Sequence, residues 1–332
     1  MKQVYVQEPL KLAIFDAPQP EVHDPKGIVV KVQATGICAT DVHTFLGETI
    51  HGKCYPFHIG HEIAGKVIAI GAEVDSVSAG DSVVVNPLIY CGTCSECISQ
   101  HWNFCKNVKA LGLTGPGGFS DYVYTIEQNV SKYFKKSPQE MSFAEPLATV
   151  LHALDLLQPI QQAASYLIQG AGTLGLLFLK ALQQKVPGID VIVSDPNVGR
   201  HTLIEQNHAK AVIPENLVGS FDIIIDCTGN VTAVQAATQK LNNHGTLLQF
   251  GVCPQNSKIE IDPFLLYRRE LSFIGAYALN NNITEAAELI DNGEIEVKDL
   301  ISGVIPREVL RETLEGLANR VLNGKYIVTI EG

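Results

Sequence analysis

The first part of the chain consists of short apolar runs separated by residues that favour turns. Three of these runs cover residues 27–34, 62–71 and 81–86. They are rich in valine, isoleucine and alanine and are separated by glycine, proline and aspartate, a pattern typical of β-strands joined by turns. We therefore expect residues 1–145 to form a mainly antiparallel, partly barrel-like β domain.

The pattern of apolar residues changes at about residue 146, where strand-like runs begin to alternate with helical patterns. The strand-like runs cover residues 165–169, 190–194, 221–226, 245–250 and 271–275. Apolar strands separated by helices indicate a parallel, doubly wound sheet, because both faces of such a sheet are covered and its strands are buried. The expected fold class is α/β, with the parallel-sheet domain over residues 146–275.

The last segment, residues 276–332, combines three further signals. An asparagine-rich turn, Asn280 to Asn282, precedes an amphipathic helical pattern over residues 284–292, and a strand-like run covers residues 325–330. We expect this segment to return to the first domain.

Composition and charge narrow the class of protein. A chain of 332 residues with 46% hydrophobic and 18% charged residues is typical of a globular protein of about two domains. The formal net charge of −11 disfavours nucleic acid and anionic membranes as partners. The uncharged stretch 156–179 contains a proline, four glutamines and three glycines, which is unlike a membrane span, and the first residues lack the apolar core of a secretion signal. We expect a cytoplasmic protein.

Four of the eight cysteines fall within fifteen positions, at Cys91, Cys94, Cys97 and Cys105. In a reducing compartment such a cluster is more typical of a metal site than of disulfides. Paired Cys-x-x-Cys turns direct thiolates to one point, and four sulfurs complete a closed tetrahedral shell around zinc. We therefore predict a structural zinc lobe near residues 88–108, which leaves no open position for a substrate.

A glycine motif follows the first predicted parallel strand. It comprises Gly170, Ala171, Gly172, Thr173, Leu174 and Gly175. An apolar helical run follows it, and Asp195 lies at the end of the next strand, a context that predicts a dinucleotide site with the pyrophosphate at the helix N-terminus. Asp195 would accept hydrogen bonds from the adenosine ribose, which favours NAD over NADP, although Arg200 nearby leaves NADP open.

Two short segments complete a larger pattern: Cys38-Ala-Thr40-Asp41-Val-His43 and Gly60-His61-Glu62. With the cysteine cluster and the glycine motif in this order, the chain resembles the zinc-dependent medium-chain alcohol dehydrogenase family over essentially its full length. The resemblance implies a GroES-like catalytic domain over residues 1–145 and a Rossmann NAD-binding domain over residues 146–275. It also implies two zinc ions per chain, one of them catalytic.

The resemblance assigns Cys38 and His61 as ligands of the catalytic zinc. Many simple alcohol dehydrogenases have a third cysteine where this chain has Glu145, within Glu145-Pro-Leu. This form is similar to the sorbitol and polyol dehydrogenase branch, in which a glutamate and water complete the site. Glu62 and Glu145 both remain candidates for the direct ligand, with the other one bonded to water.

Further roles follow from the same resemblance. Thr40 and His43 match a proton relay from the substrate hydroxyl, whereas polyol-type members could instead use the zinc-bound water and a glutamate. Asp41 would orient His61. Thr228 and Val252 are expected to contact the cofactor. No role is assigned to four other residues, His51, Cys54, His58 and His101.

The leading hypothesis is an oxidoreductase that transfers hydride from a secondary hydroxyl of a free or phosphorylated polyol to NAD, giving a ketose. L-threonine 3-dehydrogenase and small secondary alcohol dehydrogenase are the alternatives within enzymes. A catalytically silent nucleotide-binding relative is the alternative from another class. The resemblance also suggests a homodimer or homotetramer that pairs through residues 271–278, because an uncovered apolar sheet edge is a liability.

Overall fold

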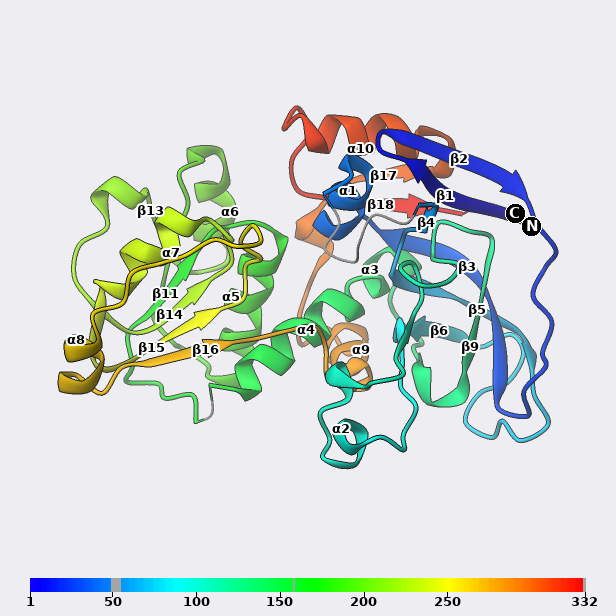
Figure 1. Ribbon diagram of the computed structural model, residues 1–332, viewed down its shortest axis with the longest axis horizontal. Helices are drawn as coiled ribbons and strands as arrows, with labels where there is room; N and C mark the ends of the chain where they lie inside the picture. Colours follow the sequence, from blue (N-terminus) through cyan, green and yellow to red (C-terminus); the bar gives the residue numbers. More distant parts are fainter. Residues whose placement is uncertain (49–54, 158, 331–332) are drawn as a thin grey trace. The chain divides into compact units, whose positions relative to one another are not determined.

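The computed structural model describes residues 1–48, 55–157 and 159–330. Contacts divide the chain into two compact units, one formed by Met1–Ala148 with Leu279–Gly332 and the other by Thr149–Ala278 (Figure 1). His51 and Cys54, to which the sequence assigned no role, lie outside the described residues. Within the described ranges, every helix is too short or too polar to span a lipid bilayer.

The first unit is built on a seven-stranded sheet. Its order is β10-β6-β5-β3-β18-β17, with β9 also paired to β3. The strands are β3 (Gly27–Gly36), β5 (Glu62–Ile70), β6 (Ser82–Val85), β9 (Tyr122–Ile126), β10 (Val130–Lys132), β17 (Ile301–Pro306) and β18 (Lys325–Thr329). All neighbours are antiparallel except β17 and β18. This confirms the mainly antiparallel β domain expected from the alternating runs.

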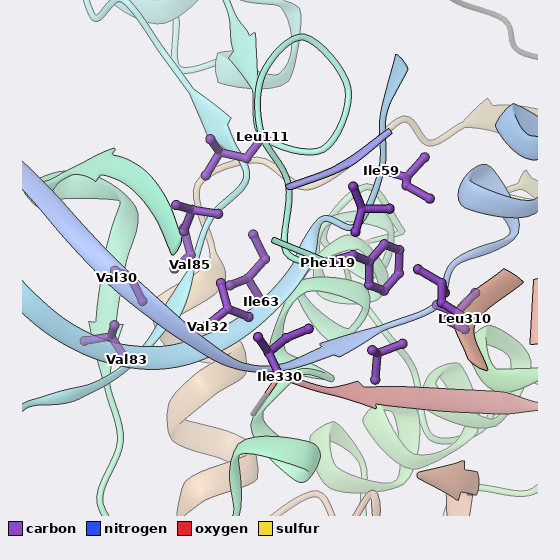
Figure 2. Packing of buried hydrophobic residues seen from close by; sticks show 14 of the residues in the cluster. Val30, Val32, Ile59, Ile63, Val83, Val85, Leu111, Phe119, Leu310 and Ile330 are labelled. Atoms are coloured by element: carbon purple, nitrogen blue, oxygen red, sulfur yellow. The ribbon is translucent and has the colours of Figure 1, made fainter. Parts of the chain in front are cut away.

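A smaller sheet in the same unit has the order β2-β1-β4 and consists of β1 (Lys2–Glu8), β2 (Lys11–Asp16) and β4 (Phe57–His58). The main cluster of buried aliphatic and aromatic side chains in this unit includes residues of β3, β5, β6 and helix α10 (Leu310–Ala318) (Figure 2). Figure 2 labels Val30, Val32, Ile59, Ile63, Val83, Val85, Leu111, Phe119, Leu310 and Ile330. Burial of these side chains fixes which face of each strand is inward, and therefore the strand register.

The segment that follows residue 278 closes this unit. Helix α9 (Ile283–Asp291) buries Ile283, Ala286, Ala287 and Ile290, the spacing of one helical face. After α9 the chain forms η5 (Lys298–Leu300), β17, η6 (Arg307–Val309), α10 and β18. Strand β18 pairs antiparallel with β3, with Ile327 opposite Gly36. The last strand thus lies beside the strand that leads to Cys38.

The second unit holds a six-stranded parallel sheet of order β13-β12-β11-β14-β15-β16. The strands are β11 (Tyr166–Gln169), β12 (Val191–Ser194), β13 (Lys210–Val212), β14 (Phe221–Asp226), β15 (Leu241–Gln249) and β16 (Ser272–Gly275). The helices between them are α5 (Thr173–Lys185), α6 (His201–Gln206), α7 (Val231–Thr238) and α8 (Pro263–Arg268). This strand order is that of the doubly wound Rossmann fold, which confirms the predicted fold class.

Two details of this sheet differ from the sequence-based expectation. The three-residue strand β13 was not predicted, because so short a run carries too little periodicity to be recognised. Strand β15 begins at Leu241, four residues before the predicted start at Gly245. Polar residues Asn242, Asn243 and His244 fill this extension, and they do not read as strand in the sequence.

Candidate active site and metal centres

The first candidate metal centre is formed by Cys38, His61 and Glu62, whose ligand atoms all lie within 4.8 Å of one another. Cys38 caps the N-terminus of α1 (Ala39–Leu46), directly after β3, and His61 directly precedes β5. Because Gly36 of β3 is the register partner of Glu62 at the start of β5, the two segments meet at one end of the sheet. Strand register thus brings together residues that lie more than twenty positions apart in the sequence.

Asp41 ties these two segments together from a position that is 1% exposed. Its carboxylate accepts hydrogen bonds from the Cys38 backbone N–H, at 2.9 Å, and from the Gly60 backbone N–H, at 2.8 Å. One carboxylate oxygen lies 3.7 Å from His61 Nδ1, which is longer than a hydrogen bond. The carboxylate faces the imidazole at this distance, which supports the proposed orienting role of Asp41.

The negatively charged groups around His61 favour a positive charge at this position. Burial lowers the pKa of the His61 imidazole, but the Asp41 carboxylate and the Cys38 sulfur raise it more, so the net pKa lies well above its usual value. His61 Nδ1 is buried without a hydrogen-bond partner among the described residues. A buried imidazole, a thiol and carboxylates in one cluster are a donor set that zinc accepts, so the residues present fit the expected catalytic metal.

Glu62 has a partner that the sequence analysis missed. Its buried carboxylate forms an ion pair with the ammonium group of Lys325, at the start of β18, and the two residues are 263 positions apart. Lys325 Nζ also donates to the Ile37 carbonyl at 3.1 Å. A lysine at the start of a strand carries no signal of burial in the sequence, and only the pairing of β18 with β3 places it here.

Glu145 lies in the first turn of α4 (Ala144–Asp155) and is 9% exposed. Burial raises the pKa of its carboxyl group, His61 lowers it, and Glu62 raises it, for a net value of about 7. In the described part of the chain, the group at ligand distance comprises Cys38, His61 and Glu62, and Glu145 lies outside it. The charges of His61 and Glu62 nevertheless act on Glu145, so both Glu62 and Glu145 are candidates for the direct carboxylate ligand.

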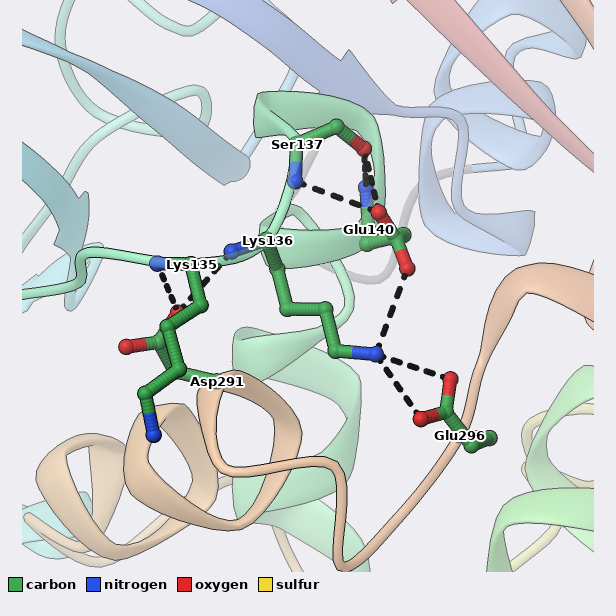
Figure 3. A network of polar contacts seen from close by, with 6 residues as sticks. All are labelled: Lys135, Lys136, Ser137, Glu140, Asp291 and Glu296. Atoms are coloured by element: carbon green, nitrogen blue, oxygen red, sulfur yellow. Dashed lines mark hydrogen bonds and ion pairs between the residues drawn. The ribbon is translucent and has the colours of Figure 1, made fainter.

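The segment that leads to Glu145 is held by the end of α9. The Asp291 carboxylate accepts backbone hydrogen bonds from Phe134, Lys135 and Lys136 at 2.7–3.0 Å. Figure 3 shows those from Lys135 and Lys136. The side chain of Lys136 contacts Glu296 at 2.8 Å and Glu140 at 3.7 Å. Ser137 and Glu140 then form a capping box that starts α3 (Pro138–Met141), which immediately precedes α4.

The two relay candidates lie three residues apart on α1, which places them on one side of the helix. Thr40 Oγ1 lies 3.7 Å from Cys38 Sγ, beside the candidate metal centre. His43 is exposed, and its Nδ1 lies 2.9 Å from a carboxylate oxygen of Glu48. Glu48 was not singled out in the sequence, where a glutamate after Gly47 reads as an ordinary surface residue.

The second candidate metal centre is the cysteine lobe, which contains β7 (Leu88–Ile89), α2 (Ser95–Ile98), η1 (Trp102–Phe104) and β8 (Lys109–Ala110). The Sγ atom of Cys97 lies 4.0 Å from that of Cys91 and 3.5 Å from that of Cys94, and Cys94 and Cys105 are separated by 4.0 Å. A tetrahedral zinc with Zn–S bonds of about 2.3 Å separates its sulfurs by about 3.8 Å. The lobe therefore has the geometry of a closed zinc site.

The environments of these sulfurs differ before any metal charge is considered. Backbone N–H groups of Thr93 and Cys94 lower the pKa of Cys91 to about 5, whereas burial raises the pKa of Cys97 to about 12. Four thiolates at such short separations repel one another unless a cation neutralises them. The donor set thus fits zinc, which would hold Cys97 in its thiolate form.

The glycine motif adopts the geometry that a dinucleotide loop needs. Gly170 has φ +92°, a conformation that favours glycine, and Gly172 caps the N-terminus of α5, with Thr173 and Leu174 in its first turn. A Cβ atom on Gly175 would lie 1.9 Å from the Gly170 carbonyl oxygen, so this glycine permits the helix to approach the loop. A Cβ on Gly172 would meet open space, on the side where a pyrophosphate would approach the helix N-terminus.

Asp195 lies at the end of β12 and is 2% exposed. Its Oδ2 accepts from the Ala171 backbone N–H at 2.7 Å and from Arg200 Nη1 at 3.0 Å, and its Oδ1 accepts from the Asn197 backbone N–H at 2.8 Å. The structure therefore joins the glycine motif, the acidic residue and Arg200 into one network. This network occupies the position where the adenosine ribose is expected.

The two predicted cofactor contacts in the second half of the sheet lie after β14 and β15. Thr228 follows β14, and its hydroxyl donates to Asp226 Oδ1 at 2.6 Å. Val252 follows β15 and is 79% exposed. Both lie beyond the carboxyl ends of parallel strands, the edge where α/β sheets bind ligands.

Two of the residues without an assigned role have structural contacts. The His58 ring packs against the Tyr5 ring, with 4.1 Å between ring centroids, and His101 is the N-cap residue of η1.

Comparison with known proteins agrees with this geometry. Residues 24–135 match the alcohol dehydrogenase GroES-like domain, and residues 173–292 match the zinc-binding dehydrogenase domain. The chain belongs to the zinc-dependent medium-chain alcohol dehydrogenase family. It is therefore an oxidoreductase of that family, as the motif order predicted, and its relatives are similar over most of its length.

Three of these relatives are informative. D-altritol 5-dehydrogenase of Agrobacterium fabrum is 31% identical over 85% of this chain and 86% of its own, and D-arabitol-phosphate dehydrogenase of Enterococcus avium is 28% identical over 97% of each. The crystal structure of a candidate zinc-binding dehydrogenase from Sinorhizobium meliloti bound to NADP superposes with a TM-score of 0.91 at 29% identity, covering 99% of both chains.

Proposed function

We propose that this enzyme oxidises a secondary hydroxyl of a polyol, free or phosphorylated, to a ketose, with NAD as hydride acceptor. The observation that carries the proposal is the buried Glu145, whose carboxyl group interacts electrostatically with His61 and Glu62, in the position where a simple alcohol dehydrogenase has a third cysteine. Two relatives named for an alditol and an alditol phosphate support the same substrate class.

The chemistry needs a group that makes an alcohol acidic and a path for its proton. When bound, zinc supplies Lewis acidity that lowers the pKa of an alcohol oxygen. Cys38 and His61 would hold the metal, and either Glu62 or Glu145 would complete the protein ligands. One thiolate and one carboxylate balance the charge of a divalent ion, so a negatively charged substrate oxygen is not repelled by excess ligand charge.

The chain offers two routes for the proton. Thr40, beside the Cys38 sulfur, would pass the hydroxyl proton through the cofactor ribose to His43, which contacts Glu48 at the surface and would release it to solvent. Alternatively Glu145, a buried carboxylate in electrostatic contact with His61, would act as the base through a water molecule. Hydride would leave the same carbon for the nicotinamide, and the carbonyl would remain.

For the cofactor, NAD is favoured because the Asp195 carboxylate would repel a ribose 2′-phosphate. Gly170, Gly172 and Gly175 would receive the pyrophosphate, with Thr228 and Val252 near the other end of the cofactor. Arg200 already contacts Asp195, and a relative of this fold binds NADP, so the two cofactors are compared directly in the test.

The test is NADH formation with a panel of free alditols, alditol phosphates, L-threonine and small secondary alcohols, before and after chelation, with zinc counted per chain. Chelator-sensitive oxidation of a polyol or polyol phosphate supports the proposal. Oxidation confined to L-threonine or small alcohols assigns the chain to the alternative enzymes. Bound zinc without reduction of NAD or NADP by the whole panel would favour the catalytically silent relative.

We also propose a homodimer or homotetramer that pairs through the edge strand β16 within residues 271–278. Strand β16 is at the end of the six-stranded sheet, and Phe264, Tyr267 and Tyr277 in the same region are exposed apolar side chains. The edge strand of a sheet is a site for pairing with a strand of another chain. Light scattering that gives a 36.0 kDa particle would refute the assembly. A four-cysteine metal site is more typical of a reducing compartment than of an oxidising one, which supports the expected cytoplasmic location.

A further inference from the structure

The asparagine turn at residues 280–282 joins the zinc lobe to the helix that carries Glu145. On the lobe side, Asn280 Oδ1 accepts from the Trp102 backbone N–H at 2.9 Å, and Asn280 Nδ2 donates to the Gln100 carbonyl at 3.1 Å. Both backbone groups lie between Cys97 and Cys105. One asparagine side chain therefore holds the loop that joins two of the four sulfur ligands.

The next residue reaches the other end of the lobe. The backbone of Asn281 hydrogen-bonds to the phenol of Tyr90, which is buried and directly precedes Cys91. Asn281 has φ +60°, a left-handed conformation that asparagine adopts more readily than most residues. The turn thus contacts the lobe next to its first ligand as well as between its last two.

The third asparagine faces α4. Asn282 Nδ2 donates to the Ala148 carbonyl at 2.7 Å, and Asn282 Oδ1 accepts from the Asn280 backbone N–H at 3.2 Å. Ala148 lies three residues after Glu145, one turn along the same side of α4. Short polar contacts therefore form a series that runs from the lobe to Asn280, from Asn280 to Asn282, and from Asn282 to the turn of α4 that carries Glu145.

We propose that Asn280 and Asn282 are positioning residues for Glu145, and that the metal-bound lobe supports the catalytic centre through them. The inference rests on the proposed role of Glu145 in polyol oxidation. The physical reason is that the Asn282 side chain anchors α4 close to Glu145. Asn282 is in turn held by Asn280, which is hydrogen-bonded to the lobe. A catalytic group displaced by a fraction of an ångström loses rate without losing cofactor affinity.

The test uses isosteric variants that remove one donor each. Asn282→Asp keeps the acceptor for Asn280 but loses the donor to Ala148, and Asn280→Asp keeps the acceptor for Trp102 but loses the donor to Gln100. Asn282→Asp places a negative charge at the N-terminus of α9, where it stabilises the helix, so Tm should not fall. Asn216→Asp, exposed in η4 (Pro214–Asn216) of the second unit, is the matched control.

We expect Asn282→Asp to lower kcat about fivefold while Tm and KM for NAD stay at the wild-type values. In the control Asn216→Asp, kcat, Tm and KM for NAD should all stay at the wild-type values. Asn280→Asp should lower kcat similarly and also speed release of lobe zinc to a chromogenic chelator. Because both contacts lie in one series, the double variant should be no slower than the slower single variant. Wild-type kcat in Asn282→Asp, or losses that multiply in the double variant, would overturn the proposal.

A second readout separates this inference from the function on which it rests. Amide hydrogen exchange over the first two turns of α4 needs no substrate, and in Asn282→Asp it should rise about two- to tenfold, the loss of one hydrogen bond. Exchange at the wild-type rate refutes the positioning role whatever the substrate is. Absence of polyol oxidation by the wild-type enzyme refutes instead the proposed function.

Discussion

The buried ion pair between Lys325 and Glu62 joins the last strand of the chain to the start of β5 across β3. Lys325 is 4% exposed and Glu62 1%, so each charge is stable in place because of the other. Gly36 of β3 makes the contact possible, since a Cβ there would lie 1.9 Å from Glu62 Oε2. The C-terminal strand thus sets the charge balance beside the candidate catalytic metal centre.

Lys325→Met tests this pairing by removing the positive charge while keeping the length of the side chain. Glu62 would be left buried without its partner, which should lower the free energy of unfolding by about 3–5 kcal/mol. Glu62→Gln in the same chain should restore most of that loss, because no charge is then unpaired. Because Glu62 is also a candidate zinc ligand, denaturant titration of the single and double variants is compared with the zinc counted per chain in each. A single variant within 1 kcal/mol of wild type, on the order of a surface pair, would contradict the coupling.

Glu145→Ala should lower kcat by about a hundredfold or more and leave NAD affinity nearly unchanged, because the glutamate belongs to the catalytic centre and not to the dinucleotide loop. Glu145→Gln is the matched control for shape. Zinc content of both variants, measured beside turnover, separates a lost ligand from a lost proton acceptor. Equal losses of turnover and NAD affinity would mean that Glu145 does not have this role.

Cys94→Ser should remove the lobe zinc and leave the other metal site filled, so zinc falls from about two ions to about one per chain. Loss of a closed site costs several kcal/mol, and for a protein of this size Tm should drop by about 10 °C. Calorimetry and metal analysis give the two values. Cys253→Ser, in the second unit, should change neither. A Cys94→Ser protein that retains two zinc ions would show that the lobe does not bind metal as proposed.

Asp195→Asn should reduce the preference for NAD over NADP by about tenfold, since the amide no longer repels a 2′-phosphate. The amide oxygen can still accept from Ala171 or Asn197, so the loop should keep its conformation. The ratio of kcat/KM for the two cofactors is the measurement. Arg200→Ala is expected to act in the opposite direction by weakening NADP. An unchanged ratio in Asp195→Asn would argue against contact between this carboxylate and the ribose.

Local spacing in the sequence was enough to predict the cysteine lobe and the glycine loop. Cys91, Cys94, Cys97 and Cys105 lie on short turns, so the covalent chain itself brings the sulfurs within 3.5–4.0 Å in the pairs described above. Gly170 and Gly175 likewise belong to one turn, where backbone conformation and close helix approach require glycine. Features of this kind depend on a few neighbouring residues and can therefore be predicted from spacing.

Only the tertiary structure showed which distant residues support the candidate catalytic centre. The pairing of Lys325 with Glu62, the support of α4 by Asn282 and the clamp of Asp291 on residues 134–136 all join segments more than a hundred positions apart. The first contact follows from the register of β18 against β3. The other two follow from the position at which α9 packs in the first unit. Register is set by burial of the whole apolar core, a collective property that no single motif of the sequence contains.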